Sequence, residues 1–335
     1  MRSIDIANKA FNEKYGTDSP MEFPQFVRKF VRNKRCKSDL EIEDNICKNL
    51  KAHSSGDDSY IKRLFRDSLD NLGIDYVTNF QLNTFTYDVY LPDKNLLIQI
   101  CPTNTHNNLF SFDEYGLGVS SMQHKAEAEN AFIHDYSCIH IFDWDNIFNI
   151  LNVLNTDSKK LENVSVEHID KSLFELFINQ YSITDNSRTG KLYYGLFSND
   201  DLVAVCSFKK SASKKYDWEI ARYCEDTLIY SADRLVPILN RFIKENNPTS
   251  VVIYVDQSKY SGKELDKAGF KYVETLYPQR MWSKGIQKVL HNTIAGRTYD
   301  EVFHTNRNSK HSTYTQMIEN GWLPVYDCGK KVYVR

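Results

Sequence analysis

The 335-residue sequence lacks any apolar run close to the roughly 18 residues that a membrane-spanning helix needs, and its first residues show no signal-peptide pattern. We therefore expect a soluble cytoplasmic protein without a membrane partner. The seven cysteines form no Cys-x-x-Cys pair, which predicts reduced buried thiols and argues against disulfides or a structural zinc site. The formal net charge is only −2, so contact with a nucleic acid must come from local basic patches.

Length and composition predict more than one domain. The chain exceeds one average domain, and 41% hydrophobic residues are enough to bury several cores. Its patterns define four segments: a basic helical segment (1–50), an α/β domain (51–155), a second α/β domain (165–285) and an extension with a helix and a β-hairpin (286–335).

The first α/β domain is organised around the stretch 87–106. Two runs rich in β-branched and aromatic residues, 87–91 and 95–101, flank a Pro-Asp turn signal, so we predict a β-hairpin. The second run is apolar at successive positions, which indicates a strand buried on both faces. The hairpin brings Asp88 close to Gln99, and a carboxylate beside a carbonyl oxygen can hold a hard divalent cation.

This arrangement resembles the PD-(D/E)XK nuclease core, in particular its very-short-patch-repair-like branch of the EDxHD type, which includes phage homing endonucleases. In that branch an Asp opens the hairpin, a Glu often closes it eleven residues later, and a His follows seven residues after that. Asp88, Gln99 and His106 occupy these positions.

The flanking segments extend the resemblance over residues 54–150. Ser-Ser-Gly-Asp at 54–57 corresponds to a Ser-x-Gly-Glu helix start in the family, His124 begins a later helix, and 139–145 is similar to the closing strand. The implied fold is α/β (α+β): a mixed sheet with flanking helices. From the residues we also expect Asp143 and Asp145 to cap the next helix.

The resemblance implies a metal-dependent, site-specific DNA endonuclease of the phage homing type, acting in the infected host cell. Mg²⁺ or Mn²⁺ would be held by Asp88, Gln99 and the backbone carbonyl of Ile100, where it would polarise a phosphate and activate a water molecule.

Three further residues are catalytic candidates. His106 would accept a proton from water, and His124 would help to neutralise the leaving oxygen. Asp57 is a candidate outer metal ligand or proton-handling group, although a carboxylate in the first turn of a helix is also favoured by the helix dipole. A structural role for His106 and a solvated helix end for His124 remain the alternatives.

Gln99 departs from the family pattern because it replaces a Glu and removes a negative charge. Gln still offers a carbonyl oxygen. Either the branch tolerates this change, or the protein has lost cleavage, or the change is a deliberate inactivation. A nuclease-derived DNA-binding protein that no longer cuts is therefore an alternative function.

Two basic stretches are candidates for contact with double-stranded DNA. The first follows a segment (12–20) similar to short modules beside the nuclease domains of phage endonucleases, and the second lies in a loop next to Tyr216 and Trp218. Solvated charges balanced by nearby acids are the alternative for both. The predicted DNA-contacting residues are Arg28, Lys29, Arg32, Lys34, Arg35, Lys37, Lys209, Lys210, Lys214 and Lys215.

The second α/β domain resembles the N-acetyltransferase (GNAT) fold in the order of its elements between 192 and 273. That fold binds the pyrophosphate of acetyl-CoA on a Gly-rich turn at a helix N-terminus. The corresponding stretch, 224–233, has no glycine and three acids. We therefore expect this fold without acetyl-CoA, as a DNA-binding or scaffolding platform, and an acyltransferase is the less favoured alternative.

Overall fold

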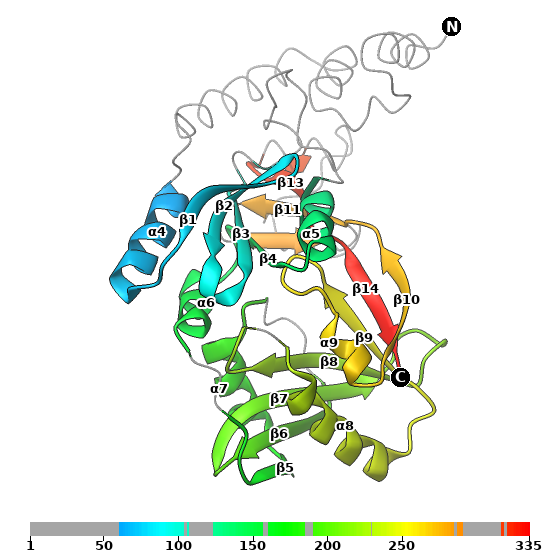
Figure 1. Ribbon diagram of the computed structural model, residues 1–335. Coiled ribbons are helices and arrows are strands. Elements are labelled where there is room, and N and C mark those ends of the chain that lie inside the picture. Colours follow the sequence, from blue (N-terminus) through cyan, green and yellow to red (C-terminus); the bar gives the residue numbers. More distant parts are fainter. Residues whose placement is uncertain are drawn as a thin grey trace, which may run out of the picture.

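The computed structural model describes residues 60–103, 106, 123–156, 160–184, 190–228, 230–284, 287–290, 316–317 and 320–335. Within these ranges the chain forms three β-sheets and six α-helices, which confirms the predicted α+β class (Figure 1). None of the described helices is long and apolar enough to cross a membrane. Asp57 and the six basic residues predicted in the N-terminal segment lie outside the described ranges.

The first sheet has four strands in the order β1-β2-β3-β4. Its strands and helices are α4 (Tyr60–Leu72), β1 (Val77–Leu82), β2 (Phe85–Leu91), β3 (Leu96–Cys101), α5 (Gln123–Ile133), β4 (Ser137–Phe142) and α6 (Ile147–Leu154). The predicted hairpin is confirmed: β2 and β3 are antiparallel and are joined by a short 3₁₀ turn at Pro92–Lys94. β4 lies parallel to β3 after the α5 crossover.

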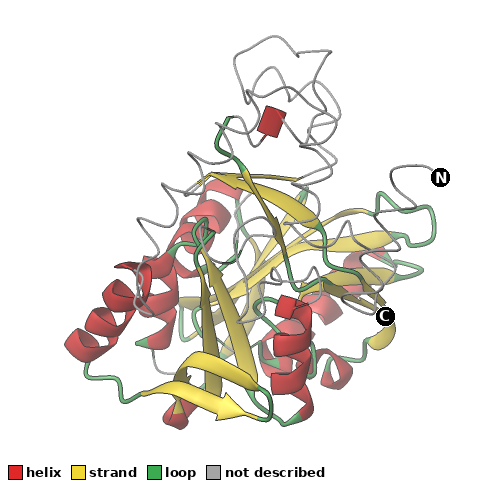
Figure 2. Cartoon of the chain, turned by 90° about the horizontal axis from the view of Figure 1, so that it is seen from above, coloured by secondary structure: helices red, strands yellow, loops and turns green. Residues whose placement is uncertain are grey.

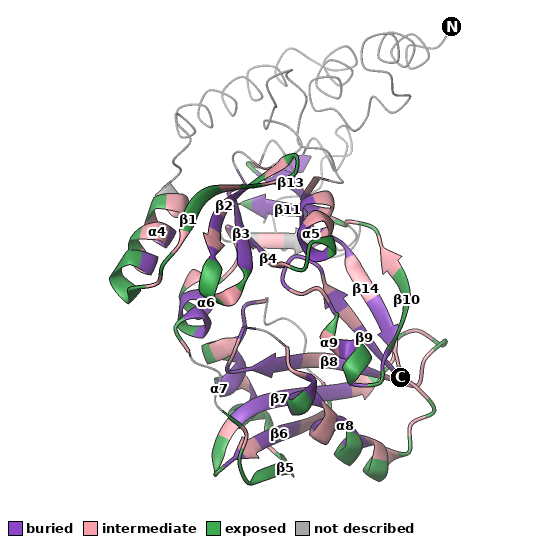
Figure 3. Cartoon of the chain, viewed as in Figure 1, coloured by how far each residue is buried: buried purple, intermediate pink, exposed green. Residues whose placement is uncertain are grey.

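Helices cover both faces of this sheet. Residues of α4 and α6 share one apolar cluster with β2, β3 and β4, whereas residues of α5 pack in another cluster with Tyr87, Leu97 and Cys138. All six residues of β3 are buried, as the sequence predicts for a strand covered on both faces (Figure 3).

The predicted caps of α6 are wrong. Asn146 is the N-cap residue and accepts hydrogen bonds from the N–H groups of Phe148 and Asn149. Asp143 instead accepts from the N–H of Thr103, and Asp145 accepts from the N–H of Phe142. The N-cap residue therefore comes one position after Asp145, and the two carboxylates bind backbone N–H groups outside the helix instead.

The second sheet has seven strands in the order β10-β14-β9-β8-β7-β6-β5, and only β8 and β9 are parallel neighbours. Its elements are β5 (Val164–His168), α7 (Lys171–Tyr181), β6 (Leu192–Ser198), β7 (Asp201–Lys210), β8 (Trp218–Glu225), α8 (Ala232–Asn246), β9 (Val251–Asp256), α9 (Glu264–Lys267), β10 (Lys271–Leu276) and β14 (Lys330–Val334). The elements from β6 to β10 follow the predicted order, whereas β5 and α7 were not predicted. Seen from above, helices flank the strands on both sides (Figure 2).

The C-terminal strands differ from the predicted hairpin. β13 (Leu323–Tyr326) joins β11 (Arg280–Lys284) and β12 (Gln287–Leu290) in a third sheet, whereas β14 enters the second sheet between β9 and β10. The chain turns between them at Gly329, which has a φ of +76°. β14 has a partner strand on each side. The C-terminal segment therefore connects the second and third sheets, and β13 and β14 do not pair with each other.

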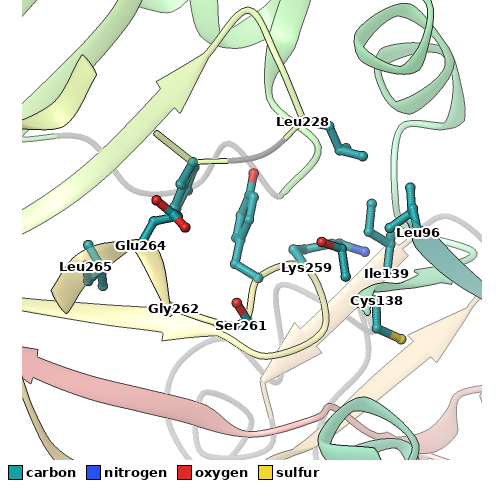
Figure 4. A pocket seen from close by; sticks show the side chains of 12 residues that line it. Leu96, Cys138, Ile139, Leu228, Lys259, Ser261, Gly262, Glu264 and Leu265 are labelled. Atoms are coloured by element: carbon teal, nitrogen blue, oxygen red, sulfur yellow. The ribbon is translucent and has the colours of Figure 1, made fainter. Parts of the chain in front are cut away.

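The first and second sheets meet at the outer strand β4. The N–H of His140 donates to the carbonyl of Ser258 over 2.8 Å, and the ammonium of Lys259 contacts Asp145 at 2.5 Å and the carbonyl of His140. Leu228 packs into the first apolar cluster. A small pocket of about 40 Å³ remains between Ile139, Leu228 and the loop that carries Lys259 (Figure 4).

Candidate active site

The backbone pairing of β2 and β3 stops part of the way along the two strands, and hydrogen bonds from polar side chains follow it. Their last backbone pair is Val89 with Ile98. Beyond it, the side-chain oxygen of Gln99 accepts from the N–H of Asp88 at 3.3 Å, and the Asp88 carboxylate accepts from the N–H of Ile100 at 2.8 Å. We call these three residues the Asp88 fork. The predicted proximity of Asp88 and Gln99 is confirmed.

The backbone around Asp88 departs from a regular strand. Tyr87 packs on the α5 side of the sheet and Val89 on the opposite side, although residues two apart share a face in a regular strand. Asn79, which the register places opposite Asp88, has a φ of 52°, a left-handed conformation that Asn tolerates better than most residues. This irregularity lets the Asp88 carboxylate lie between the two strands.

Lys62 of α4 completes the fork. Its ammonium lies 2.5 Å from the second oxygen of Asp88, and the two side chains are 20% and 13% exposed. The acid is therefore paired and within reach of solvent. A divalent cation that binds the same oxygen competes with the ammonium of Lys62, because both need its negative charge.

A pair of histidines lies beside the fork. His124, in the first turn of α5, is buried, and its Nδ1 lies 2.8 Å from the carbonyl oxygen of Tyr326. Its Nε2 lies 3.2 Å from Nδ1 of the partly exposed His106. A carbonyl oxygen only accepts, so Nδ1 of His124 carries the proton and its Nε2 is an acceptor. His106 then donates from Nδ1, which leaves its Nε2 unprotonated.

Both histidines are neutral at neutral pH. Burial, with a smaller contribution from His124, lowers the pKa of His106 to about 3, and burial also lowers the pKa of His124. The positive charge of Lys62 contributes to the lowered pKa of His106, so the fork and the histidine pair act on each other electrostatically. A neutral imidazole offers an unprotonated nitrogen to a proton, although its lowered pKa makes His106 a weaker base than a free histidine.

A buried acid–histidine pair, Glu127 with His140, lies behind His124. Glu127 of α5 contacts Nε2 of His140 at 3.1 Å and accepts from Gln123 at 3.0 Å. Burial alone would raise the pKa of Glu127, but the hydrogen bond and charge of His140 outweigh it and lower that pKa to about 2. This buried pair fixes α5 against β4 and holds a negative charge near the histidines.

The structure brings together five of the six candidates predicted for catalysis or metal binding. Asp88, Gln99 and Ile100 form the fork, and His106 and His124 form the pair. Both ring nitrogens of His124 are engaged, one with the carbonyl of Tyr326 and the other with His106. Its contact with a leaving oxygen stays a prediction.

Lys62, Glu127 and the carbonyl of Tyr326 were not predicted. Glu127 was within reach of sequence reasoning, because it lies three residues after His124 on one helix face. Lys62 and Tyr326 come from segments far from the hairpin, and no local pattern marks them.

The predicted basic loop is wrong for its first two lysines, because Lys209 and Lys210 are the last residues of β7 and pair with β8. The basic residues of this stretch have compensating acids. Lys209 pairs with Glu219 at 3.2 Å, Lys210 with Asp217 at 2.7 Å, and Lys215 lies 4.0 Å from Glu274. The ammonium of Lys210 also lies 4.3 Å above the ring of Trp218. These pairs reduce the positive field of the loop, while the ammonium groups remain at the surface.

The stretch compared above with a pyrophosphate-binding turn is filled by the chain itself. The carboxylate of Glu225 accepts from the N–H of Ser231 at 2.7 Å, just before α8, and Asp226 pairs with the buried Arg234. A helix N-terminus attracts anions; here the anion is a side chain of the protein.

No protein-family model matches the chain, and no curated protein matches it. The class of protein is therefore argued from the fold and the site.

Proposed function

We propose that the chain is a metal-dependent endonuclease that hydrolyses phosphodiester bonds of double-stranded DNA at the Asp88 fork. The observation that carries the proposal is the carboxylate held between two parting strands, next to an ammonium and a neutral imidazole with an unprotonated nitrogen. Phosphodiester hydrolysis needs such groups: a cation ligand, a positive charge for the phosphate and a proton acceptor.

The donor set of the fork fits Mg²⁺ or Mn²⁺. Mg²⁺ is commonly held by one or two carboxylates together with water and substrate phosphates. Asp88 supplies the carboxylate, and the side-chain oxygen of Gln99 and the carbonyl of Ile100 are the neighbouring oxygen donors. When bound, the cation polarises the phosphate and lowers the pKa of a coordinated water.

The chain's own residues supply the remaining roles. Lys62, which pairs with Asp88, would supply the positive charge for a phosphate oxygen. His106 accepts a proton at Nε2, and His124 with the carbonyl of Tyr326 holds His106 in the tautomer that leaves Nε2 unprotonated. The order of elements, helix–three strands–helix–strand, agrees with the proposed PD-(D/E)XK relationship.

The DNA-contacting surface belongs to the same proposal. It comprises the basic residues between 28 and 37 and the lysines at the end of β7 and in the loop that follows (209–215), and it suits a site-specific enzyme of the phage homing type in the cytoplasm of an infected host. The second sheet then serves as a scaffold, because Glu225 already occupies the start of α8. A protein that binds DNA without cutting is the second candidate, and Gln99 is the observation that favours it.

The test is incubation of supercoiled plasmid with Mg²⁺ or Mn²⁺, comparing the unaltered chain with Asp88→Ala and Gln99→Glu. The matched control is Asp93→Ala, an exposed acid in the turn of the same hairpin. We expect metal-dependent nicking or linearisation that is lost in Asp88→Ala and kept in Asp93→Ala. Cleavage only by Gln99→Glu selects a disabled nuclease, and DNA binding without any cleavage contradicts the endonuclease.

A further inference from the structure

Three side chains beside the fork bring nitrogen and sulfur atoms together. The sulfur of Cys101, at the end of β3, and ring nitrogens of His106 and His124 all lie within 4.8 Å of one another. Cys101 and His124 are buried, whereas His106 is partly exposed. Thiolate and imidazole are ligands that select zinc and related transition metals over Mg²⁺.

The geometry of the two histidines suits a shared metal ion. Two nitrogens bound to one tetrahedral zinc at about 2.0–2.1 Å lie about 3.3–3.4 Å apart. Nδ1 of His106 and Nε2 of His124 are separated by 3.2 Å. The other nitrogen of His124 donates to the carbonyl of Tyr326, which is how most metal-bound histidines are oriented. The lone pair of Nε2 therefore already points toward the cluster.

We infer that Cys101, His106 and His124 form a binding site for one zinc ion, and that zinc at this site withdraws His106 from catalysis. The effect on catalysis rests on the proposed function, whereas the binding of zinc does not. The site has three protein ligands, and His106 is the partly exposed one among them. This proposal departs from the expectation drawn from the scattered cysteines, which argued against a structural zinc site.

Zinc would bind the same two atoms, Nδ1 of His106 and Nε2 of His124, that share a hydrogen bond when no metal is bound. Without metal, the proton on Nδ1 of His106 points to Nε2 of His124, and Nε2 of His106 accepts protons. With zinc bound to Nδ1, that proton moves to Nε2, so His106 no longer accepts. The Cys101 thiol releases its proton to solvent as the sulfur binds. One ion therefore switches His106 between proton acceptor and metal ligand.

Metal binding is measured on the full, reduced chain after dialysis against a chelator. We expect one equivalent of Zn²⁺ to stay bound through gel filtration, and Co²⁺ to give thiolate-to-metal charge-transfer absorption. Cys101→Ser should lose that absorption and bind Zn²⁺ at least about 10-fold more weakly, since losing a ligand costs at least as much as losing the hydrogen bond that orients one. Cys138→Ser is the matched control, because Cys138 is a buried thiol on the adjacent strand.

Partly exposed His106 provides a second variant whose folding is less at risk: His106→Ala should also lose stoichiometric Zn²⁺. Equal Zn²⁺ affinity in Cys101→Ser and the unaltered chain, or no stoichiometric Zn²⁺ in the unaltered chain, would overturn the site. These readouts need no cleavage, so they separate failure of the site from failure of the proposed function.

The regulatory part is tested through cleavage in excess Mg²⁺ with and without one equivalent of Zn²⁺. The ratio of the two rates should fall well below one in the unaltered chain and in Cys138→Ser, and stay near one in Cys101→Ser. Stoichiometric Zn²⁺ that leaves the cleavage rate unchanged would overturn the switch.

Discussion

The two large sheets each contain a place where neighbouring strands part, and they fill it differently. In the first sheet, β2 and β3 separate at the Asp88 fork, where partly exposed charged and hydrogen-bonding side chains gather. In the second, β8 and β9 pair only at Trp218–Glu219 with Val251–Val252. Beyond that point lie the Tyr230–Tyr260 stack, with ring centroids 3.8 Å apart, and the carboxylate of Glu225.

The difference lies in which polar groups keep access to solvent and to a ligand. Asp88 is paired with Lys62 but both remain partly exposed, so a cation or phosphate can exchange with either. Glu225, Asp226 and Arg234 are all buried and bonded to one another or to the backbone. One parting of strands thus keeps its charged groups partly exposed, and the other is closed by its own side chains and packs against the first domain.

The largest expected effect is on the cleavage rate, and it distinguishes Asp88 of the first sheet from Glu225 of the second. Asp88→Asn removes the negative charge that a cation needs and should lower the cleavage rate by about 10²–10³-fold or more. Glu225→Gln, the same chemical change at the second parting, should leave the rate within about 3-fold, because no substrate reaches it. Plasmid cleavage under matched conditions measures both, with circular dichroism as the check on folding. Equal losses in the two variants would contradict the assignment of chemistry to one sheet alone.

The junction between the sheets gives the next effect. Lys259 is buried against Asp145, and Lys259→Met leaves that acid without its cation, which should lower the free energy of unfolding by about 3–5 kcal/mol. Lys263 also crosses the junction, to the exposed Asp135 at 2.6 Å, and Lys263→Met should cost far less, because solvent screens an exposed pair. Denaturant unfolding compares them; similar losses would mean that the buried pair does not hold the sheets together.

The pH dependence of stability should have opposite signs in the two regions. The pKa of His106 is lowered from 6.5 to about 3 by burial, so the unfolded chain binds more protons between these values and stability is lost as the pH falls. Burial raises the pKa of Glu225 from 4.5 to about 7, so stability is lost as the pH rises between those values. Each contributes at most about 1.4 kcal/mol per pH unit.

Unfolding measured across pH 4.5–6.5 in His106→Gln and Glu225→Gln tests this contrast. In His106→Gln, the free energy of unfolding should fall less as the pH is lowered. In Glu225→Gln, it should fall less as the pH is raised. Slopes that change in the same direction would show that the two groups do not differ in the way burial predicts.

The smallest effect concerns two lysines of the second sheet, Lys210 at the end of β7 and Lys214 in the loop that follows. Among the described residues no acid pairs with Lys214, whereas Lys210 is held by Asp217. If the loop touches DNA, Lys214→Ala should weaken binding by about 1 kcal/mol or less and reduce the salt slope by about 1. Lys210→Ala should do less, because its charge is already compensated. An unchanged salt slope in both would remove this loop from the DNA surface.

The sequence predicted the parts of the site that lie close together along the chain. The β2–β3 hairpin, its Pro-Asp turn and the approach of Asp88 to Gln99 follow from local strand and turn preferences. The helix that carries His124 was also predicted. Whether His124 is buried or lies at a solvated helix end was left open, and the structure shows that it is buried.

The rest depends on packing between distant segments. Lys62 reaches Asp88 only because α4 lies on that face of the sheet, and Tyr326 reaches His124 only because β13 and β14 enter different sheets. The break in strand alternation at Asp88 was not predicted, although Asn79 and Asp88 are of residue types that are uncommon inside strands. Tertiary contacts decided these features, and local periodicity does not report them.

The central claim is that the Asp88 fork holds the catalytic cation, and equilibrium binding of Mn²⁺ followed by electron paramagnetic resonance tests it most directly. The measurement uses the full chain with DNA, comparing the unaltered protein, Asp88→Asn and Glu225→Gln. We predict one tightly bound Mn²⁺ per chain in the unaltered protein and in Glu225→Gln, and its loss in Asp88→Asn. Undiminished Mn²⁺ binding in Asp88→Asn would contradict the account.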